Sequence, residues 1–532
     1  MPASVVVRGG TVYDGTGSPG RSADVVLDGD AIALVGTAPE RLDALEIEAS
    51  GLAVIPGLVN VLSHAWGTLQ QDGSAASELL QGVTTEVFGE AYTPGPSSPE
   101  FVELCAASYQ NGVRADYSRL SEGLSDLESL GVAVNVASSL GGHNLRLLAA
   151  GFEDRRLTTR ELDRLRGLVA EEMEEGALGL GTALIYPPGR FADTEELVQL
   201  CEVVAAHDGL YSSHLRSEGD RFLEALDELL EINARTGVRA EVFHLKAGGR
   251  ANWPKMAQAV ERISGARAAG RAISADMYPY EAGATELAAS IPPRFHEGGP
   301  EALAERLADP AQRELMAAEI RSTSDDFENL FLAAGGGAGV LFLDDLSDGT
   351  PSAGRYLTAV AADLGLDEVD ALLELVRRDP AIGVAYFIID PEGIELGLRQ
   401  PWVSVGSDAT AHPATAPWVD SATHPRTYGT FARVLGHYSR DLGLFGFAEA
   451  VRKMTSQPAD VFRLAGRGRL VEGAFADVVV LDPGTVGDRA TFDDPHRLSV
   501  GVSHVLVNGE VVVRDGAVTP ARSGRRLRRG MR

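Results

Sequence analysis

Apolar and polar positions alternate in two different ways along the chain. Near both ends, short alternating runs are interrupted by Gly and Asp turns, as in SVVVRGGTVYDG (residues 4–15) and VSHVLVNGEVVVRDG (residues 502–516). This alternation predicts short antiparallel strands, and the NG and DG pairs predict hairpin turns. We therefore expect residues 1–55 and 466–518 to pair into one small β-sandwich formed by both termini.

Between the two ends, apolar runs are separated by amphipathic helical stretches such as TTRELDRLRGLVAEEMEEG (residues 158–176). Apolar runs of this length, bounded by polar residues, predict buried parallel strands. Eight such runs cover residues 58–64, 84–89, 132–139, 177–184, 210–215, 240–246, 272–278 and 402–408. Eight strands with helical crossovers predict an α/β fold, the (β/α)8 TIM barrel.

The regular spacing breaks before the last of these runs. We expect an inserted subdomain at residues 285–345, so that the barrel is built from residues 56–284 and 346–465. The later barrel part would then include the run VAYFII (residues 384–389). The Arg-rich end, residues 519–532, is predicted to be a solvated, partly disordered tail.

Composition narrows the possible partners. A chain of 532 residues is too long for one simple core. Its formal net charge of −29 argues against nucleic acid and anionic membranes as partners.

The sequence shows no secretory signal pattern and no apolar run of transmembrane length. The two cysteines, Cys105 and Cys201, fall in predicted helices and suggest a reducing compartment, so we expect a cytoplasmic protein.

Two consecutive strand runs end in histidine: LYSSHLRSE contains His214, and AEVFHLKAG contains His244. The carboxyl ends of barrel strands form the active face, where imidazoles can converge on one metal ion. Glu90, which follows the run at 84–89, can supply a third ligand. Two histidines, one carboxylate and a water are a common catalytic zinc set. The alternative is two hydrogen-bonded core histidines without a metal.

The last strand run, WVSVGSD, ends in Asp408 on the same face. A carboxylate there can take a proton from a water bound to the metal; the alternative is a helix cap for the segment that follows. Lys246 comes directly after the His244 run, in a chain with only three lysines. This rarity favours a functional role over that of an ordinary surface lysine.

The chain resembles the N-acyl-D-amino-acid deacylase (D-aminoacylase) family of the amidohydrolase superfamily. The resemblance covers nearly the whole length and is carried by many short motifs together. They include GGTVYDGTGSPG, VIPGLVNVLSH, QGVTTEVFGE, GALGLGTALIYPPG, SHLRSE, FHLKAGG, DMYPYEAGAT, VGSDAT and HPRTYGTFARVLG. It implies a metal-dependent hydrolase of amide bonds, with a barrel and a β-sandwich.

The chain departs from the family pattern at the first strand. The family usually has Asp-x-His-x-His there, whereas this chain has Asn60 and Leu62 before His64. Leucine cannot bind a metal, and the family's frequent second-strand cysteine is replaced by Glu90. With these changes, the resemblance implies one zinc ion held by Glu90, His214 and His244. His64 either completes this site or contacts the substrate.

Substrate contacts are carried over from the family position by position. Lys246 and Arg426 match residues that bind an α-carboxylate. A buried pair of cations is costly unless an anion lies between them, and the substrate's carboxylate is the simplest such anion. Tyr186 and Tyr280 match pocket tyrosines that orient the amide, although plain packing is the alternative for both.

Arg216 and Glu218 are expected to form a supporting pair at the mouth of the site. The expected reaction is hydrolysis of an N-acyl amino acid, a small amide that carries a carboxylate, with Asp408 as general base and then general acid. Two alternatives remain open. One is a hydrolase of cyclic amides or dipeptide-like substrates with the same site. The other is a non-catalytic relative with a degraded metal centre, which Asn60 and Leu62 would favour.

Overall fold

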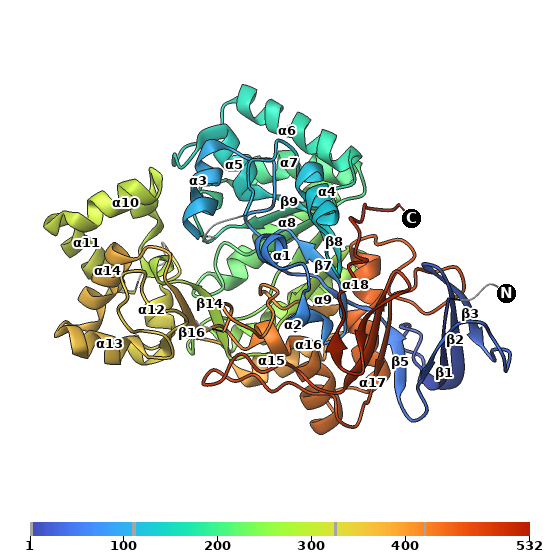
Figure 1. Ribbon diagram of the computed structural model, residues 1–532. Helices are drawn as coiled ribbons and strands as arrows, with labels where there is room; N and C mark the ends of the chain where they lie inside the picture. The colour runs from blue at the N-terminus through green and yellow to red at the C-terminus, as the bar shows by residue number, and fades with distance from the viewer. Residues whose placement is uncertain (1–3, 109–112, 324–326, 420–421, 532) are drawn as a thin grey trace.

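The computed structural model describes residues 4–108, 113–323, 327–419 and 422–531. A barrel occupies the middle of the molecule, with a sheet built from both termini at one end and an inserted set of helices and strands at the other (Figure 1). Within the described parts of the chain, no helix is long and apolar enough to cross a bilayer.

The predicted barrel is confirmed. Its strands are β6 (Leu58–Asn60), β7 (Val83–Phe88), β8 (Asn135–Ser138) continued by β9 (Leu140–Gly141), β10 (Gly179–Ala183), β11 (Leu210–His214), β12 (Arg239–Val242), β13 (Ile273–Met277) and β17 (Val403–Val405). Neighbouring strands are parallel. The ring closes where Asp408 N donates to Leu62 O and His64 N donates to Ala409 O. This closure brings the ends of β6 and β17 side by side.

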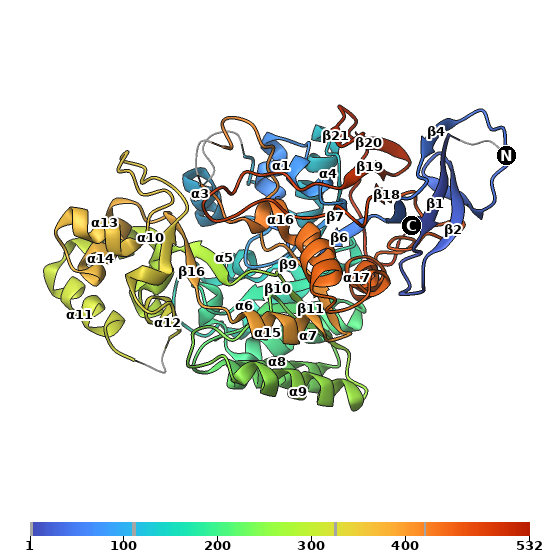
Figure 2. The same ribbon diagram turned by 90° about the horizontal axis from the view of Figure 1, so that it is seen from below.

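Amphipathic helices cover the outside of the barrel. They include α6 (Thr159–Glu174), α7 (Thr194–Ala206), α8 (Phe222–Thr236) and α9 (Lys255–Ala268). Figure 2 shows α8 and α9 side by side along the barrel. The helix α6 starts at a capping box in which Thr158 and Glu161 satisfy each other's backbone N–H groups. Because each helix returns the chain to the amino end of the next strand, all strand carboxyl ends face one side.

Both termini contribute to one nine-stranded sheet, as predicted. Its members are β1 (Val5–Val12), β2 (Arg21–Asp28), β3 (Ala31–Gly36), β4 (Leu45–Glu48), β5 (Ala53–Pro56), β18 (Val478–Leu481), β19 (Val502–Val507), β20 (Glu510–Arg514) and β21 (Ala517–Val518). The antiparallel pairing of β5 with β18 joins the two halves. The sheet encloses an apolar core of its own that includes Val25, Val54 and Val478.

The inserted part forms a separate three-stranded sheet. Its strands are β14 (Ala282–Glu286), β15 (Val340–Phe342) and β16 (Gly383–Phe387), and its helices include α10 (Gly299–Ala308), α11 (Pro310–Ile320), α13 (Leu357–Leu364) and α14 (Glu368–Arg378). The strand β16 lies between β14 and β15 and is antiparallel to both. This pairing corrects the assignment of VAYFII to the barrel, since a buried apolar run looks the same in either sheet.

The Arg-rich end is ordered, so the prediction of a disordered tail was wrong for the described residues. Val136 N donates to Arg525 O, and Leu527 N donates to Val136 O, along the edge of β8 that does not pair with β7. Arg525 also pairs with Asp30 at 2.6 Å. These are backbone and long-range partners, which charge composition alone does not reveal.

Candidate active site

Glu90 lies at the centre of the predicted metal ligands. Its Oε1 atom is 2.9 Å from His214 Nδ1 and 3.2 Å from His244 Nε2. Its Oε2 atom is 3.4 Å from His64 Nε2, which in turn lies 2.9 Å from Asp408 Oδ1. The structure therefore brings together all five residues for which the sequence predicted metal or proton chemistry.

Two of these residues have strained backbones. His244 and Asp408 have positive φ angles of 35° and 51°, a region that costs a residue with a side chain about 1–3 kcal/mol and that clusters at functional sites. The backbone N–H of His244 is held by Asp276 Oδ1 at 3.0 Å. The turn at each strand end thus aims the side chain across the barrel mouth.

The donor set fits a zinc ion. Potential ligand atoms of Glu90, His214 and His244 all lie within 4.8 Å of one another, and all three residues are buried. His214 Nε2 is buried, has no hydrogen-bond partner among the described residues, and lies 3.4 Å from Glu218 Oε2. Two imidazoles and one carboxylate are typical zinc ligands. His64, Glu90 and Asp408 form a second group that also meets the 4.8 Å limit and shares Glu90.

The charges around Asp408 keep its carboxylate ionised. Burial alone would raise the pKa of Asp408, but the guanidinium of Arg426 and the hydrogen bond with His64 lower it to about 2. Burial likewise would lower the pKa of His64, but hydrogen bonds to Asp408 and Glu90 raise it to about 9. Asp408 is therefore available as a proton acceptor over the whole neutral range.

Lys246 and Arg426 each have a carboxylate partner of their own. Lys246 Nζ donates to Glu218 Oε1 at 2.7 Å, and Arg426 Nη1 donates to Asp408 Oδ2 at 2.7 Å. The expectation that these two cations require an anion between them is therefore wrong. Lys246 Nζ also lies 2.8 Å from His244 Nδ1, so it contacts a predicted metal ligand directly.

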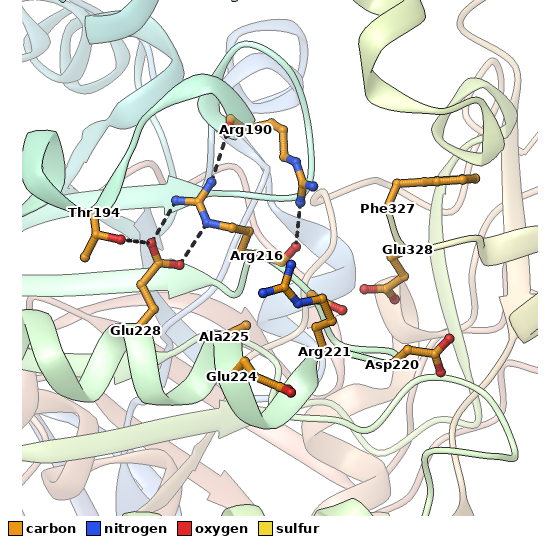
Figure 3. Close-up of a pocket in the computed structure, with 11 residues that line it drawn as sticks. Arg190, Thr194, Arg216, Asp220, Arg221, Glu224, Ala225, Glu228, Phe327 and Glu328 are labelled. Atoms are coloured by element: carbon orange, nitrogen blue, oxygen red, sulfur yellow. Dashed lines mark hydrogen bonds and ion pairs between the residues drawn. The ribbon is translucent and has the colours of Figure 1, made fainter. Parts of the chain in front are cut away.

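The predicted pair of Arg216 and Glu218 does not form. Arg216 Nε donates to Glu228 Oε2 at 2.9 Å, and its Nη1 donates to the backbone oxygen of Arg190 at 2.9 Å (Figure 3). These groups line a separate pocket of about 280 Å³ beside the active site. Glu218 points instead toward Lys246, whose Nζ donates to Glu218 Oε1 at 2.7 Å.

A cavity of about 760 Å³ opens above the metal ligands, between the barrel and the inserted part. Tyr186 lines it, with its ring edge-on to His214 at 5.3 Å between centroids. Tyr280 is not among its lining residues: its hydroxyl donates to Pro425 O at 3.4 Å, and Arg433 lies over its ring. The nearby Tyr278 lines the cavity instead, with Arg426 over its ring at 4.8 Å.

Sequence reasoning missed Tyr278, His143 and Glu328, which all line this cavity. Glu328 accepts a hydrogen bond from the backbone N–H of Glu218 at 2.6 Å. The motif DMYPYEAGAT contained both tyrosines, but only the path of the turn at Pro279 decides which of them enters the cavity. For Glu328, which comes from the inserted part, the sequence carried no signal.

Comparison with known proteins shows the family of the chain. A model of the amidohydrolase family matches residues 395–513. D-aminoacylase from Alcaligenes xylosoxydans xylosoxydans is 33% identical, over 99% of this chain and 98% of that protein. N-acyl-D-glutamate deacylase from the same organism is 34% identical, over 99% of this chain and 96% of that protein.

Solved structures give the same result. N-acyl-D-glutamate deacylase from Bordetella bronchiseptica, complexed with zinc and a phosphonate inhibitor, matches with a TM-score of 0.81 and 30% identity, over 99% of this chain and 100% of that chain. A D-aminoacylase described as having a binuclear metal center matches with a TM-score of 0.82 and 31% identity, with the same coverage.

The alternatives are not favoured. A dihydropyrimidinase from Brevibacillus agri shares only 16% identity at a TM-score of 0.59, which shows a common fold and no more. A degraded centre is at odds with the convergence of Glu90, His214, His244 and Asp408 at the floor of one cavity. The chain belongs to the D-aminoacylase family of amidohydrolases and is a metal-dependent hydrolase of carbon–nitrogen bonds other than peptide bonds.

Proposed function

We propose that the protein hydrolyses the amide bond of N-acyl-D-amino acids, using one zinc ion held by Glu90, His214 and His244. The observation that carries this proposal is the position of Asp408. Its carboxylate belongs to the ligand group that shares Glu90, and it lines the same cavity. The D configuration is proposed from the names of the relatives that match over the full length.

A zinc ion in this set would polarise the amide carbonyl and lower the pKa of a water molecule. Asp408 accepts a proton from the attacking water and then donates it to the nitrogen of the leaving amine. Arg426 donates a hydrogen bond to Asp408 Oδ2, while Asp408 Oδ1 faces His64. Lys246 donates a hydrogen bond to Glu218 and lies close to His244 Nδ1, so it orients the ring of His244.

Arg426 is the residue we propose for the substrate carboxylate. It lines the cavity and donates from Nη1 to Asp408, while Nη2 donates to Ala284 O at a long distance of 3.5 Å. A guanidinium can bind two anions through different edges, which an ammonium cannot do with the same geometry. Lys246 is less suited to this role than the sequence suggested, because Glu218 already compensates its charge.

Arg426→Lys should therefore have two separable effects. Loss of the hydrogen bond from the guanidinium to Asp408 should lower kcat for every substrate. Loss of the contact with the carboxylate should raise KM about tenfold or more for an N-acyl-D-amino acid, the scale of a charged hydrogen bond, but not for the matching primary amide. Steady-state kinetics on an acid and amide pair test this. An equal change of KM on both would remove Arg426 from carboxylate binding.

The metal count has its own test. Because Leu62 replaces a family ligand, we expect one tightly bound zinc ion per chain, although His64, Glu90 and Asp408 form a second compact group. His64→Ala should still bind one equivalent, since His64 lies outside the set of Glu90, His214 and His244. Elemental analysis of dialysed protein measures the zinc content of the wild type and of His64→Ala. Two tightly held equivalents in the wild type, or none in His64→Ala, would contradict this assignment.

The substrate class is tested by a panel of compounds with zinc-loaded protein. N-acetyl-D-amino acids should be hydrolysed, and their L enantiomers should be poor substrates. Cyclic amides of the hydantoin type serve as the comparison. Ring opening without hydrolysis of open-chain N-acyl amino acids would overturn the proposal in favour of a cyclic-amide hydrolase.

We place the enzyme in the cytoplasm. Cys105 in α3 (Pro99–Ser108) and Cys201 in α7 are both free and buried, as is usual for a protein of a reducing compartment. The proposed partner is a small carboxylate-bearing amide, which matches the polar floor and apolar walls of the cavity.

A further inference from the structure

We propose that one wall of the active-site cavity is a binding site for a large apolar acyl group, so that the preferred substrates carry an aliphatic chain or aryl group well beyond acetyl. This inference rests on the proposed function and deepens it. It follows from where the polar and apolar residues lie around the barrel.

The polar groups that act on the amine lie on one arc of the barrel. Asp408 follows β17, and Arg426 contacts it from the same side. The leaving nitrogen must approach Asp408 to receive its proton, and that nitrogen carries the α-carbon and the carboxylate. The substituent on the carbonyl carbon then points away from Asp408, across the metal ligands.

The arc that this substituent would meet is apolar. It is built from residues that follow β7 and β10 and from α3, namely Tyr92, Phe101, Leu104 and Ile185. The Tyr92 and Phe101 rings are stacked with centroids 5.4 Å apart. The described lining residues include one lysine, Lys246, and one arginine, Arg426. Both lie on other arcs of the barrel, and each already pairs with a carboxylate.

The inserted part completes this wall at its far end. Ala288, Ala289, Ile291 and Leu303 line the cavity from that side. Contact with the barrel is direct, because Gly298 N donates to Phe152 O at 3.2 Å. The wall therefore extends well beyond the metal ligands.

The size of the cavity agrees with a large acyl group. About 760 Å³ lies within the range of about 300–1,000 Å³ that holds a drug-sized ligand. An acetyl group would leave most of the apolar wall in contact with water. Each methylene that this wall buries should strengthen binding by up to roughly fourfold.

The test is a series of N-acyl-D-leucines with acetyl, butanoyl, hexanoyl and octanoyl groups. We expect kcat/KM to rise by about tenfold or more from acetyl to octanoyl. This rise is smaller than the one expected if the wall buried every added methylene completely. Leu104→Trp and Ala289→Phe, which fill the wall from opposite sides, should each lower the octanoyl-to-acetyl ratio severalfold. Glu103→Gln, an exposed neighbour on α3 outside the cavity, is the control and should keep the wild-type ratio.

Binding provides a readout that does not depend on turnover. Dissociation constants of the same series for zinc-loaded Asp408→Asn protein should fall with chain length. Hydrolysis of N-acetyl-D-leucine without any chain-length preference would overturn the acyl site and leave the proposed function intact. A preference that follows the amino-acid side chain but not the acyl chain would also overturn it. If none of the compounds is hydrolysed but binding still becomes tighter with acyl chain length, the proposed hydrolysis is refuted and the acyl-binding site is retained.

Discussion

Asp408→Asn should lower kcat by about 10²–10⁴-fold, the usual contribution of a positioned proton acceptor, while the protein stays folded and keeps its zinc. Asparagine has nearly the same shape, so the hydrogen bond that Arg426 donates can be kept through its side-chain oxygen. It cannot accept a proton at neutral pH. Single-turnover kinetics, circular dichroism and zinc content measure the three quantities.

A variant with most of its kcat would mean that Asp408 only supports the barrel closure next to Leu62 and His64. A variant that loses zinc as well would mean that Asp408 is a ligand in the group it forms with His64 and Glu90. The two outcomes are distinguished by the zinc analysis, because only the second changes the metal content.

Glu90→Ala should abolish zinc binding and activity together. Its carboxylate lies close to His214 and His244 on one side and to His64 on the other. Replacing Glu90 by alanine therefore removes a potential ligand from both groups. Removing a residue that merely orients a ligand costs about 10–100-fold in metal affinity, and removing a ligand should cost more. Equilibrium dialysis with zinc gives the affinity.

Glu90→Cys is the matched variant. Thiolate is a strong zinc ligand, and cysteine often stands at this position in the family, so this variant should bind zinc with high affinity where Glu90→Ala does not. If both variants bind zinc as tightly as the wild type, Glu90 is not a ligand. Glu286→Gln, which changes an exposed carboxylate of the same cavity, should keep the wild-type zinc affinity.

The barrel and its chemistry could be read from the sequence because both depend on local pattern. Strands that are buried on both faces are continuous apolar runs, and the residue that ends each run lies on the active face. This logic predicts from the sequence alone that Glu90, His214, His244 and Asp408 lie together. The resemblance to a family added Arg426, at the start of α16 (Arg426–Arg433), and Tyr186, in the turn after β10.

The pairing of charges could not be read in this way. Whether Lys246 meets a substrate or Glu218 depends on two loops that follow different strands. The same holds for Arg426 and Asp408, whose contact needs the segment after β17 to fold back over the barrel mouth. Non-local backbone pairing likewise decided the positions of β16 and of the Arg-rich end.

The most direct test of the account is the release of D-leucine from N-acetyl-D-leucine by the zinc-loaded protein. We expect turnover that stops when a chelator removes zinc and that returns in proportion to the zinc added back, up to one equivalent per chain. The L enantiomer should be hydrolysed far more slowly under the same conditions. Turnover that persists in metal-free protein, or its absence with all N-acyl-D-amino acids in fully loaded protein, would contradict the account.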